Sequence, residues 1–125
     1  MKQQTLTKAE MQVMNALWQL PEGGTVNEVL DFYDEPKPAY TTIATFLRIL
    51  QIKGFLQVYK KKGDGKRLHY APIITKDEYT RNVLEDVKDN FFDGSVKNLL
   101  SFFAREEKIS AAEIREIYEM VNGKD

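Results

Sequence analysis

The 125-residue sequence contains no cysteine and a single histidine, His69. Without cysteine there can be neither a disulfide framework nor a thiolate metal site, and a lone histidine is more often a packing or surface residue than a metal ligand. Paired acids such as Glu85-Asp86 and Glu106-Glu107 indicate solvated helix faces, and no glycine-rich phosphate loop is present. These absences argue against an enzyme, and the sequence predicts no metal site and no cofactor.

Long apolar runs are also lacking. No stretch of the chain approaches the ~18 to 20 apolar residues that a membrane-spanning helix requires. The opening MKQQTLTKAE has no apolar segment of the kind found in a secretory signal. We therefore expect a cytoplasmic protein without membrane insertion, with room for one compact domain and a short extension.

Net charge is nearly absent, at −1, but the charges are unevenly distributed along the chain. Residues 1–72 carry ten Lys/Arg and seven Asp/Glu, a net of +3, whereas residues 73–125 carry eight and twelve, a net of −4. Within residues 37–72, eight basic residues accompany one acid, Asp64, which is a local net of +7. Such a block attracts polyanions, above all the phosphate backbone of nucleic acids; the alternative is a solvated basic surface without a partner.

Capping signals predict two helices near the start of the chain. Thr7 and Glu10 are spaced as a capping box, in which each side chain satisfies a free backbone N–H of the first helical turn. This box begins a helix over about residues 8–20. A second box, Thr25 with Glu28, begins a short helix that the following Pro36 stops.

A third helix is predicted over residues 38–53, with Pro38 at its first position and Gly54 closing it. At 100° per residue it has two distinct faces. No acid occurs from residue 36 to residue 63, so the polar face offers hydroxyls and positive charge without a carboxylate that would repel phosphates. The apolar face contains Ile43, Phe46, Leu47 and Leu50, and the opposite face contains Thr41, Thr45 and Arg48.

After Gly54 the pattern becomes typical of strands, with β-prone residues at 55–59 and again at 67–70. Between them lies Gly63-Asp64-Gly65, and Asp-Gly between two such runs is a strong hairpin signal, because glycine accepts the positive φ of the turn. We expect a two-stranded wing. Its tip carries Lys60, Lys61, Lys62, Lys66 and Arg67.

The remainder of the chain has the pattern of three short amphipathic helices. Thr75 with Glu78 forms a capping box before a helix that Gly94 breaks, a second helix follows around residues 96–103, and a fourth box at Ser110 begins the last. These helices bury too little to be stable alone, so a second copy of the chain is the simplest partner; the alternative is that the tail folds back on its own domain in a monomer. The residues expected at the dimer contact are Tyr79, Val83, Val87, Phe91, Leu99, Leu100, Phe103, Ile114, Ile117, Tyr118 and Val121.

Three helices followed by a hairpin are the plan of a winged helix-turn-helix domain. We expect a mainly α fold with a small β-hairpin: a winged helix-turn-helix DNA-binding domain over residues 1–73 and a helical dimerisation domain over residues 74–125. In such domains the recognition helix enters the major groove with its N-terminal residues at the base edges. The candidate DNA-binding residues are Ala39, Tyr40, Thr41, Thr42, Thr45 and Arg48 on the helix, and Lys60, Lys61, Lys62, Lys66 and Arg67 on the wing.

Several segments stand in a characteristic order and spacing along nearly the whole chain: LTKAEMQVMNALW, TVNEV, YTTIATFLRILQIKGFL, GKRLHYAP and DGSVKNLLSFFAREEKISAAEIREI. Together they resemble the BlaI/MecI/CopY family of bacterial repressors. The resemblance implies a homodimeric transcriptional repressor of antibiotic-resistance or metal-homeostasis operons, which holds a palindromic operator in double-stranded DNA until it is inactivated.

For the β-lactam branch of that family, the resemblance implies inactivation by proteolysis. In those members a membrane-bound metalloprotease sensor triggers cleavage in the tail, and the resemblance implies that the cleaved position corresponds to Ser101, Phe102, Phe103 and Ala104 here. The best-known members have an Asn-Phe bond where this sequence has Phe102-Phe103. Copper-sensing members carry a C-terminal cysteine motif, which the absence of cysteine argues against.

A different class of function is also compatible with the fold. Winged helices can serve as protein-protein interaction modules without binding DNA, because a fold does not dictate a function. The acid-free polar face of the third helix favours DNA over this alternative.

Overall fold

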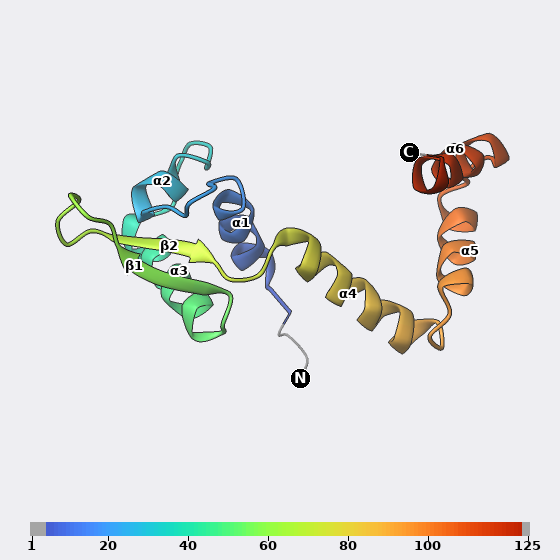
Figure 1. The fold of residues 1–125 in the computed structure, drawn as a ribbon, viewed down its shortest axis with the longest axis horizontal. Coiled ribbons are helices and arrows are strands. Elements are labelled where there is room, and N and C mark those ends of the chain that lie inside the picture. Colours follow the sequence, from blue (N-terminus) through green and yellow to red (C-terminus); the bar gives the residue numbers. More distant parts are fainter. Residues whose placement is uncertain (1–4, 124–125) are drawn as a thin grey trace. The chain divides into compact units, whose positions relative to one another are not determined.

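The computed structural model describes residues 5–123, and in that range it contains six helices and one two-stranded antiparallel sheet (Figure 1). The chain divides into two compact units, which we call the winged unit (residues 1–82) and the tail unit (residues 83–125). The mainly helical fold with a single hairpin agrees with the expected class. The division falls after Asn82, within a helix, rather than after residue 73.

Helix α1 (Lys8–Leu17) and helix α2 (Val26–Leu30) begin at the capping boxes expected from the sequence. The N–H of Thr7 donates to Glu10 Oε1 at 2.9 Å, and the N–H of Glu10 donates to Thr7 Oγ1 at 3.1 Å. The equivalent pair at Thr25 has distances of 2.9 and 3.2 Å. Helix α1 ends before residue 20 because its last turn tightens to bonds between residues three apart, such as Leu20 N–H to Leu17 O at 3.0 Å.

Helix α3 spans Tyr40–Ile52, and its N-cap is Ala39, whose backbone is extended (φ −68°, ψ 150°). The prediction that Pro38 is the first helical residue is therefore wrong, because the chain turns into the helix only after Ala39. The predicted end is confirmed. Gly54 has φ +89°, its N–H donates to Gln51 O at 3.0 Å, and the N–H of Phe55 donates to Leu50 O at 2.9 Å, which is the Schellman arrangement that ends many helices at glycine.

Strands β1 (Leu56–Lys60) and β2 (Leu68–Pro72) form the predicted hairpin, with Val58 opposite Tyr70. The turn before α2 adds a short bridge to this sheet, since Gly24 and Tyr70 exchange two backbone hydrogen bonds of 2.8 Å each. The neighbouring Gly23 has φ +86°, and a Cβ atom there would lie 2.5 Å from Tyr70 O. Only glycine allows the turn to approach β2 so closely.

The core of the winged unit is formed where α1, α2, α3 and the hairpin meet. Full burial of one aliphatic or aromatic side chain contributes about 1.5–3 kcal/mol, so burial of this cluster stabilises the unit. The largest fully buried side chains are Val13, Met14, Leu17, Val29, Ile43, Leu47, Leu50, Phe55 and Leu56.

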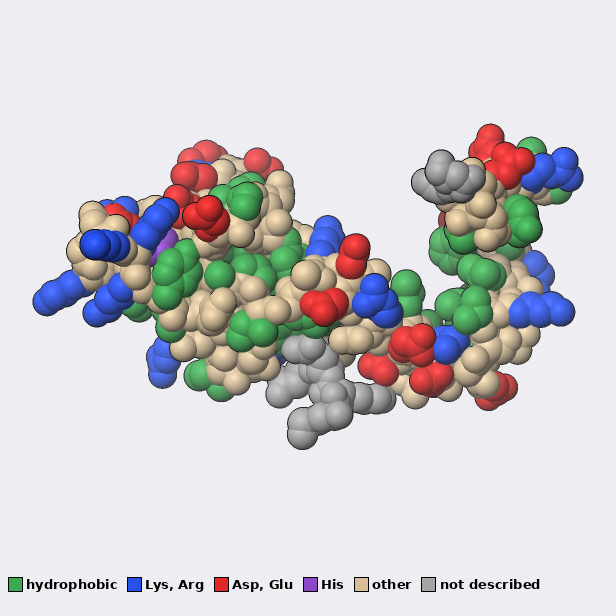
Figure 2. Space-filling view, viewed as in Figure 1, with side chains coloured by type: hydrophobic (Ala, Val, Ile, Leu, Met, Phe, Trp, Pro, Cys, Tyr) green, Lys and Arg blue, Asp and Glu red, His purple; other side chains and the backbone are tan. Residues whose placement is uncertain are grey.

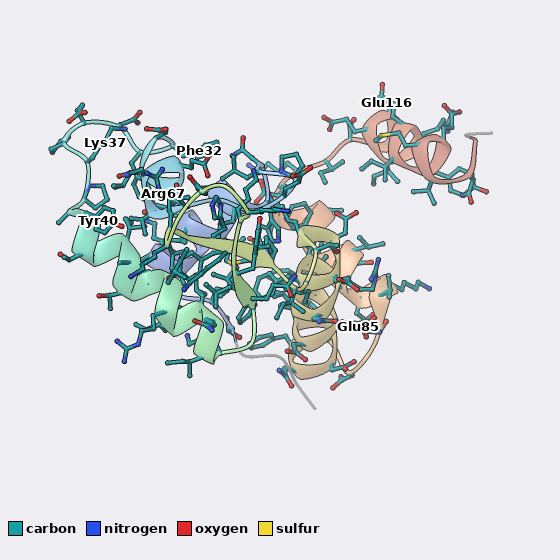
Figure 3. All side chains as sticks on the ribbon, turned by 60° about the vertical axis from the view of Figure 1, so that its left-hand side comes forward. Phe32, Lys37, Tyr40, Arg67, Glu85 and Glu116 are labelled. Atoms are coloured by element: carbon teal, nitrogen blue, oxygen red, sulfur yellow. The ribbon has the colours of Figure 1, made fainter. Side chains whose placement is uncertain are left out.

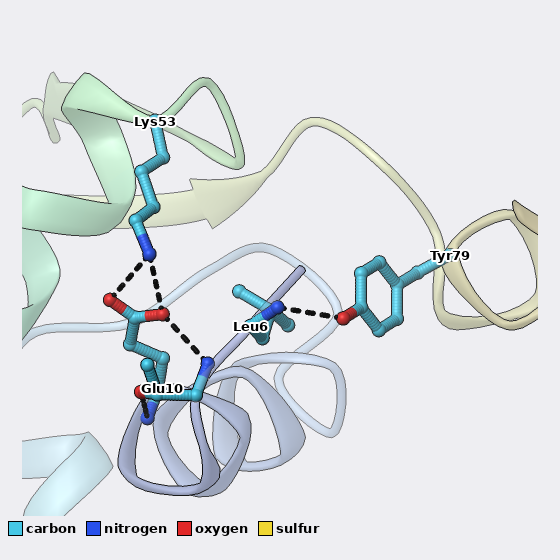
Figure 4. Close-up of polar contacts among 5 residues, drawn as sticks. Leu6, Glu10, Lys53 and Tyr79 are labelled. Carbon is cyan, nitrogen blue, oxygen red and sulfur yellow. Dashed lines mark hydrogen bonds and ion pairs between the residues drawn. The ribbon is translucent and has the colours of Figure 1, made fainter. Parts of the chain in front are cut away.

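The first turn of helix α4 (Lys76–Phe91) belongs to the same core. Thr75 and Glu78 form the predicted capping box, with bonds of 2.9 and 3.0 Å. Tyr79 is buried: its ring lies 5.7 Å from Phe55, and its hydroxyl accepts a 2.8 Å bond from the N–H of Leu6 (Figure 4). Tyr79 was expected at the dimer contact, but it lies in the interior of the winged unit, which therefore extends beyond residue 73.

The tail unit contains the second half of α4, helix α5 (Val96–Glu106) and helix α6 (Ala111–Asn122). The predicted box at Ser110 is present, with bonds of 3.0 and 3.1 Å to Glu113. Among residues 83–123 no side chain is buried. Of the helices formed by the described residues, none is both long and apolar enough to span a membrane.

Candidate nucleic-acid interface

Helix α3 separates the side chains that it buries from those that it exposes. Its buried face consists of Ile43, Leu47 and Leu50. The opposite face is therefore turned toward the solvent. Thr45 Oγ1 donates to Thr41 O at 2.8 Å, so the hydroxyl proton of Thr45 is used within the helix, and its lone pair and methyl group remain on the surface. All predicted contact residues of this region are exposed: Ala39, Tyr40, Thr41, Thr42, Thr45 and Arg48.

The second basic element is the wing, which we define as residues 56–72. Lys and Arg side chains gather at the end of the hairpin and project away from the protein (Figure 2). Among residues 5–123, no acid pairs with Lys60, Lys61 or Lys62. The predicted wing residues Lys60, Lys61, Lys62, Lys66 and Arg67 are all exposed.

Two other cations of the basic block have structural roles. Lys37, labelled in Figure 3, donates to the carbonyl oxygens of Leu30 and Tyr33 at 2.9 and 2.7 Å, so its ammonium group satisfies the C-terminal end of α2. Lys53 lies 2.8 and 2.9 Å from the two carboxylate oxygens of Glu10 (Figure 4). The cations left for a polyanion are therefore Arg48 and the five of the wing, which are the ones that the sequence singled out.

The ion pair between Glu10 and Lys53 joins α1 to the end of α3. Burial by itself raises the pKa of the Glu10 carboxyl, but the hydrogen bonds from Lys53 and from the N–H of Thr7 outweigh it, and the pKa is lowered from its ordinary value. Glu10 therefore stays ionised although its side chain is buried. The ion pair thus links the C-cap residue of α3 to the first turn of α1.

A cleft of about 300 Å³ lies between the first turn of α3, the start of α2 and the basic end of the hairpin. It brings together Tyr40, Lys66 and Arg67, of which Tyr40 and Arg67 are labelled in Figure 3. In the part of the chain that the structure describes, no carboxylate lines the cleft. Tyr70 lies in the wall of this cleft. Burial and the neighbouring Tyr40 raise the pKa of its phenol, which therefore remains neutral.

Two further residues of the cleft, Thr25 and Asn27, were not predicted. Their sequence signal is that of a helix start, and Thr25 is accounted for by its capping box. Only the packing of α2 against α3 and the hairpin places these side chains beside the basic wing. Asn27 carries both an amide donor and an acceptor, which suits contact with a phosphate or a sugar.

The tail unit presents its predicted contact residues on an open apolar surface. A groove of about 650 Å³ between α5 and α6 is lined mainly by apolar side chains, among them Leu100, Phe103, Ile114 and Ile117. The other predicted residues of this unit are partly or fully exposed: Val83, Val87 and Leu99 are half-buried, and Phe91, Tyr118 and Val121 are exposed.

The segment expected to contain a cleavage site lies within a helix. Helix α5 contains all four residues, Ser101, Phe102, Phe103 and Ala104. The ring of Phe102 packs on that of Phe92, with the ring centroids 5.6 Å apart. An intact helix does not offer its peptide bonds to a protease, so cleavage here requires local unfolding of α5.

Groups of three or more His, Cys, Asp or Glu side chains that could hold a metal ion do not occur among the described residues. His69, the lone histidine, is buried in the wing, where its Nε2 lies 2.7 Å from Asp64 Oδ2.

The chain is similar to known proteins over nearly its whole length. The model of a protein family described as penicillinase repressor matches residues 6–123. The penicillinase repressor of Bacillus licheniformis is 24% identical over 116 residues, which cover 93% of this chain and 88% of that protein. The methicillin resistance regulatory protein MecI of Staphylococcus aureus (strain N315) is 24% identical over 119 residues, 95% of this chain and 94% of that protein. The penicillinase repressor of Staphylococcus aureus is 24% identical over 121 residues, 97% and 94% of the two chains.

Proposed function

The chain belongs to the penicillinase repressor family, and on that premise we propose that it is a homodimeric, sequence-specific repressor of transcription that binds a palindromic operator. The observation that carries the proposal is the surface formed by α3 and the wing. An acid-free row of hydroxyls on α3 lies beside an exposed cluster of cations, with a cleft between them that no carboxylate lines in the described residues.

The chemistry of this surface fits a DNA duplex. The first turn of α3 enters the major groove, where Thr41 and Thr42 offer hydroxyls and methyl groups to base edges and each contact discriminates modestly. Arg48 lies farther along the helix, at a position suited to a phosphate. The lysines of the wing contact the adjacent backbone, and the cleft at Tyr40 and Arg67 receives a phosphate between helix and wing.

The dimer is proposed because the tail unit lacks an interior of its own. None of its described residues is buried, and chains of this size are marginal even when their apolar faces are covered. A second copy of the same α5–α6 groove supplies the missing surface through a two-fold axis, the commonest symmetry of soluble oligomers. Two recognition helices related by such an axis bind half-sites about one helical turn, roughly 34 Å, apart or a multiple of it.

Regulation follows from the same groove. Two of the matched relatives are named for penicillinase repression and methicillin resistance, and we propose that this chain, acting in the cytoplasm, likewise controls a resistance operon until a membrane-bound metalloprotease sensor triggers its inactivation. Cleavage between Ser101 and Ala104, after local unfolding of α5, would sever one wall of the groove from the other. The dimer would then dissociate, and its two recognition helices would no longer bind the two half-sites of the operator together.

A footprint on the DNA upstream of the gene for this protein tests the proposal. We expect two protected half-sites, and a dimer in sedimentation of the free protein. The variant Arg48→Ala combined with alanine at Lys60, Lys61 and Lys62 should lose protection. A protein-protein interaction module without DNA binding predicts no protection in either protein, and that result would refute the repressor function.

A further inference from the structure

The wing contains an internal network that involves none of the predicted DNA-contact residues. His69 on β2 is buried, and its Nε2 lies 2.7 Å from Asp64 Oδ2 in the connection between the strands. Its ring stacks on that of Tyr59, its partner in the strand register, with centroids 5.4 Å apart and planes at 26°. The Tyr59 hydroxyl donates in turn to the carbonyl oxygen of Glu22, in the turn before α2.

We propose that Asp64 and His69 form a brace that positions the basic tip of the wing for its contact with the phosphate backbone. This inference rests on the proposed function as a DNA-binding protein. Asp64 lies at the centre of the connection, between Lys60–Lys62 on one side and Lys66 and Arg67 on the other. The network continues from Asp64 through His69 and Tyr59 to Glu22, so it ties the tip to the turn that precedes α2.

The connection needs such a brace because its own backbone holds it weakly. Residues 61–67 lie outside the strand ladder, and two single turn bonds order them, Asp64 N–H to Lys61 O at 3.0 Å and Arg67 N–H to Asp64 O at 3.3 Å. Gly63 and Gly65 flank Asp64 and allow many alternative conformations. The neighbouring lysines also repel one another. Both turn bonds involve the backbone of Asp64, so anchoring its side chain restrains both turns.

The hydrogen bond of this brace requires a proton on Nε2 of His69. Both the Nε2–H tautomer of the neutral imidazole and the imidazolium cation carry that proton, so either can donate to the carboxylate. The hydrogen bond is charge-assisted and largely shielded, since the side chain of His69 is 7% exposed and that of Asp64 35%. The carboxylate thereby faces the strand, and the lysines around it remain directed to the solvent.

The variant Asp64→Ala separates this role from simple electrostatics, because the two predict opposite signs. Removing a carboxylate from a phosphate-binding surface should strengthen binding if charge alone matters. If Asp64 is a brace, the variant should bind the duplex from the footprint on the order of tenfold more weakly, since the freed connection must be ordered on binding. Asp34→Ala is the matched control: it removes an exposed carboxylate from the loop before α3, outside the wing, and should leave affinity unchanged or raised.

His69→Phe keeps an aromatic ring against Tyr59 but lacks the nitrogen that meets Asp64. It should weaken binding as Asp64→Ala does, and the double variant should be no weaker than either single one, because both remove the same bond. In the background of alanine at Lys60, Lys61 and Lys62 the Asp64 effect should shrink, since the brace acts through those cations. An equal effect in that background, or equal or tighter binding by Asp64→Ala, overturns the proposal.

The brace can also be judged without DNA, so its failure is distinguishable from failure of the repressor function. In the free protein, the amides of Asp64 and Arg67 should exchange with solvent more slowly in the wild type than in Asp64→Ala, with an unchanged urea midpoint for global unfolding. Equal exchange rates refute the brace even if the wild type binds its operator. A wild type that protects no DNA refutes the repressor function, while slower exchange would still support an ordered wing tip.

Discussion

The contribution of the wing to DNA binding can be calculated from the number of phosphates that its lysines neutralise. Lys60, Lys61 and Lys62 are exposed, and nothing in residues 5–123 pairs with them, so their charges are available to a polyanion. Each neutralised phosphate contributes about 0.9 to the slope of log K against log salt concentration. If each wing makes one such contact, replacing all three lysines by alanine flattens the slope for a dimer by about 1.8. If every lysine meets a phosphate, the flattening reaches about 5.4.

The same arithmetic gives the affinity. One contact corresponds to a factor of about 8 between 1 M and 0.1 M salt, so the loss of one contact per wing weakens a dimer by about 60-fold at 0.1 M. Fluorescence anisotropy with the footprinted duplex measures the affinity at each salt concentration. Repeating it from about 50 to about 400 mM KCl gives the salt slope and the affinity at about 0.1 M, and so checks both predicted changes. Alanine at Lys8, Lys76 and Arg81 is the control, because it removes the same charge from exposed positions outside α3 and the wing. A slope that changes equally in both variants would refute a wing-specific contact and leave only the net charge of the protein.

Three further predictions concern the proposed dimer contact and the interior of the winged unit. Replacing Leu100 and Ile117 in the tail groove by aspartate should convert the proposed dimer into monomers, which sedimentation equilibrium would detect; an unchanged dimer mass would place the dimer contact elsewhere. Lys53→Met should destabilise the protein by about 1–3 kcal/mol in urea unfolding at pH 7, because the buried Glu10 loses its two bonds. Since folding lowers the pKa of Glu10, its stabilising effect is present above the ordinary glutamate pKa and is lost as the pH falls through the lowered folded value, so the difference between Lys53→Met and wild type should shrink in acid. Tyr79→Phe leaves the N–H of Leu6 without its acceptor and should cost about 1–3 kcal/mol without reducing dimer formation, which a shift of the urea midpoint and an unchanged sedimentation profile would show.

A charge count finds eight cations in residues 37–72, but it does not show which of them face the solvent. The structure assigns Lys37 to the carbonyl end of α2 and Lys53 to Glu10, whose carboxylate lies 43 positions away in the chain. Helix periodicity and the hairpin signal, which are local patterns, instead predict Arg48 and the basic wing residues as candidate contacts.

Local patterns also predicted where most elements begin. All four capping boxes are present, at Thr7, Thr25, Thr75 and Ser110, because such a box needs only residues three positions apart to agree on one turn. The start of α3 was the exception. Pro38 fits a first helical position by its own φ, but the sequence supplies no side-chain cap there, and the extended Ala39 delays the helix to Tyr40.

By itself the sequence thus determined the helices, the hairpin and the polar face of α3, since each depends on neighbours within a few residues. Only the tertiary structure decided which side chains meet across the chain. Tyr79 joins Leu6 over 73 positions and belongs to the core of the winged unit, and Thr25 and Asn27 come to lie beside Arg67 in one cleft. These contacts arise from packing between elements distant in sequence, and no period or spacing along the chain encodes them.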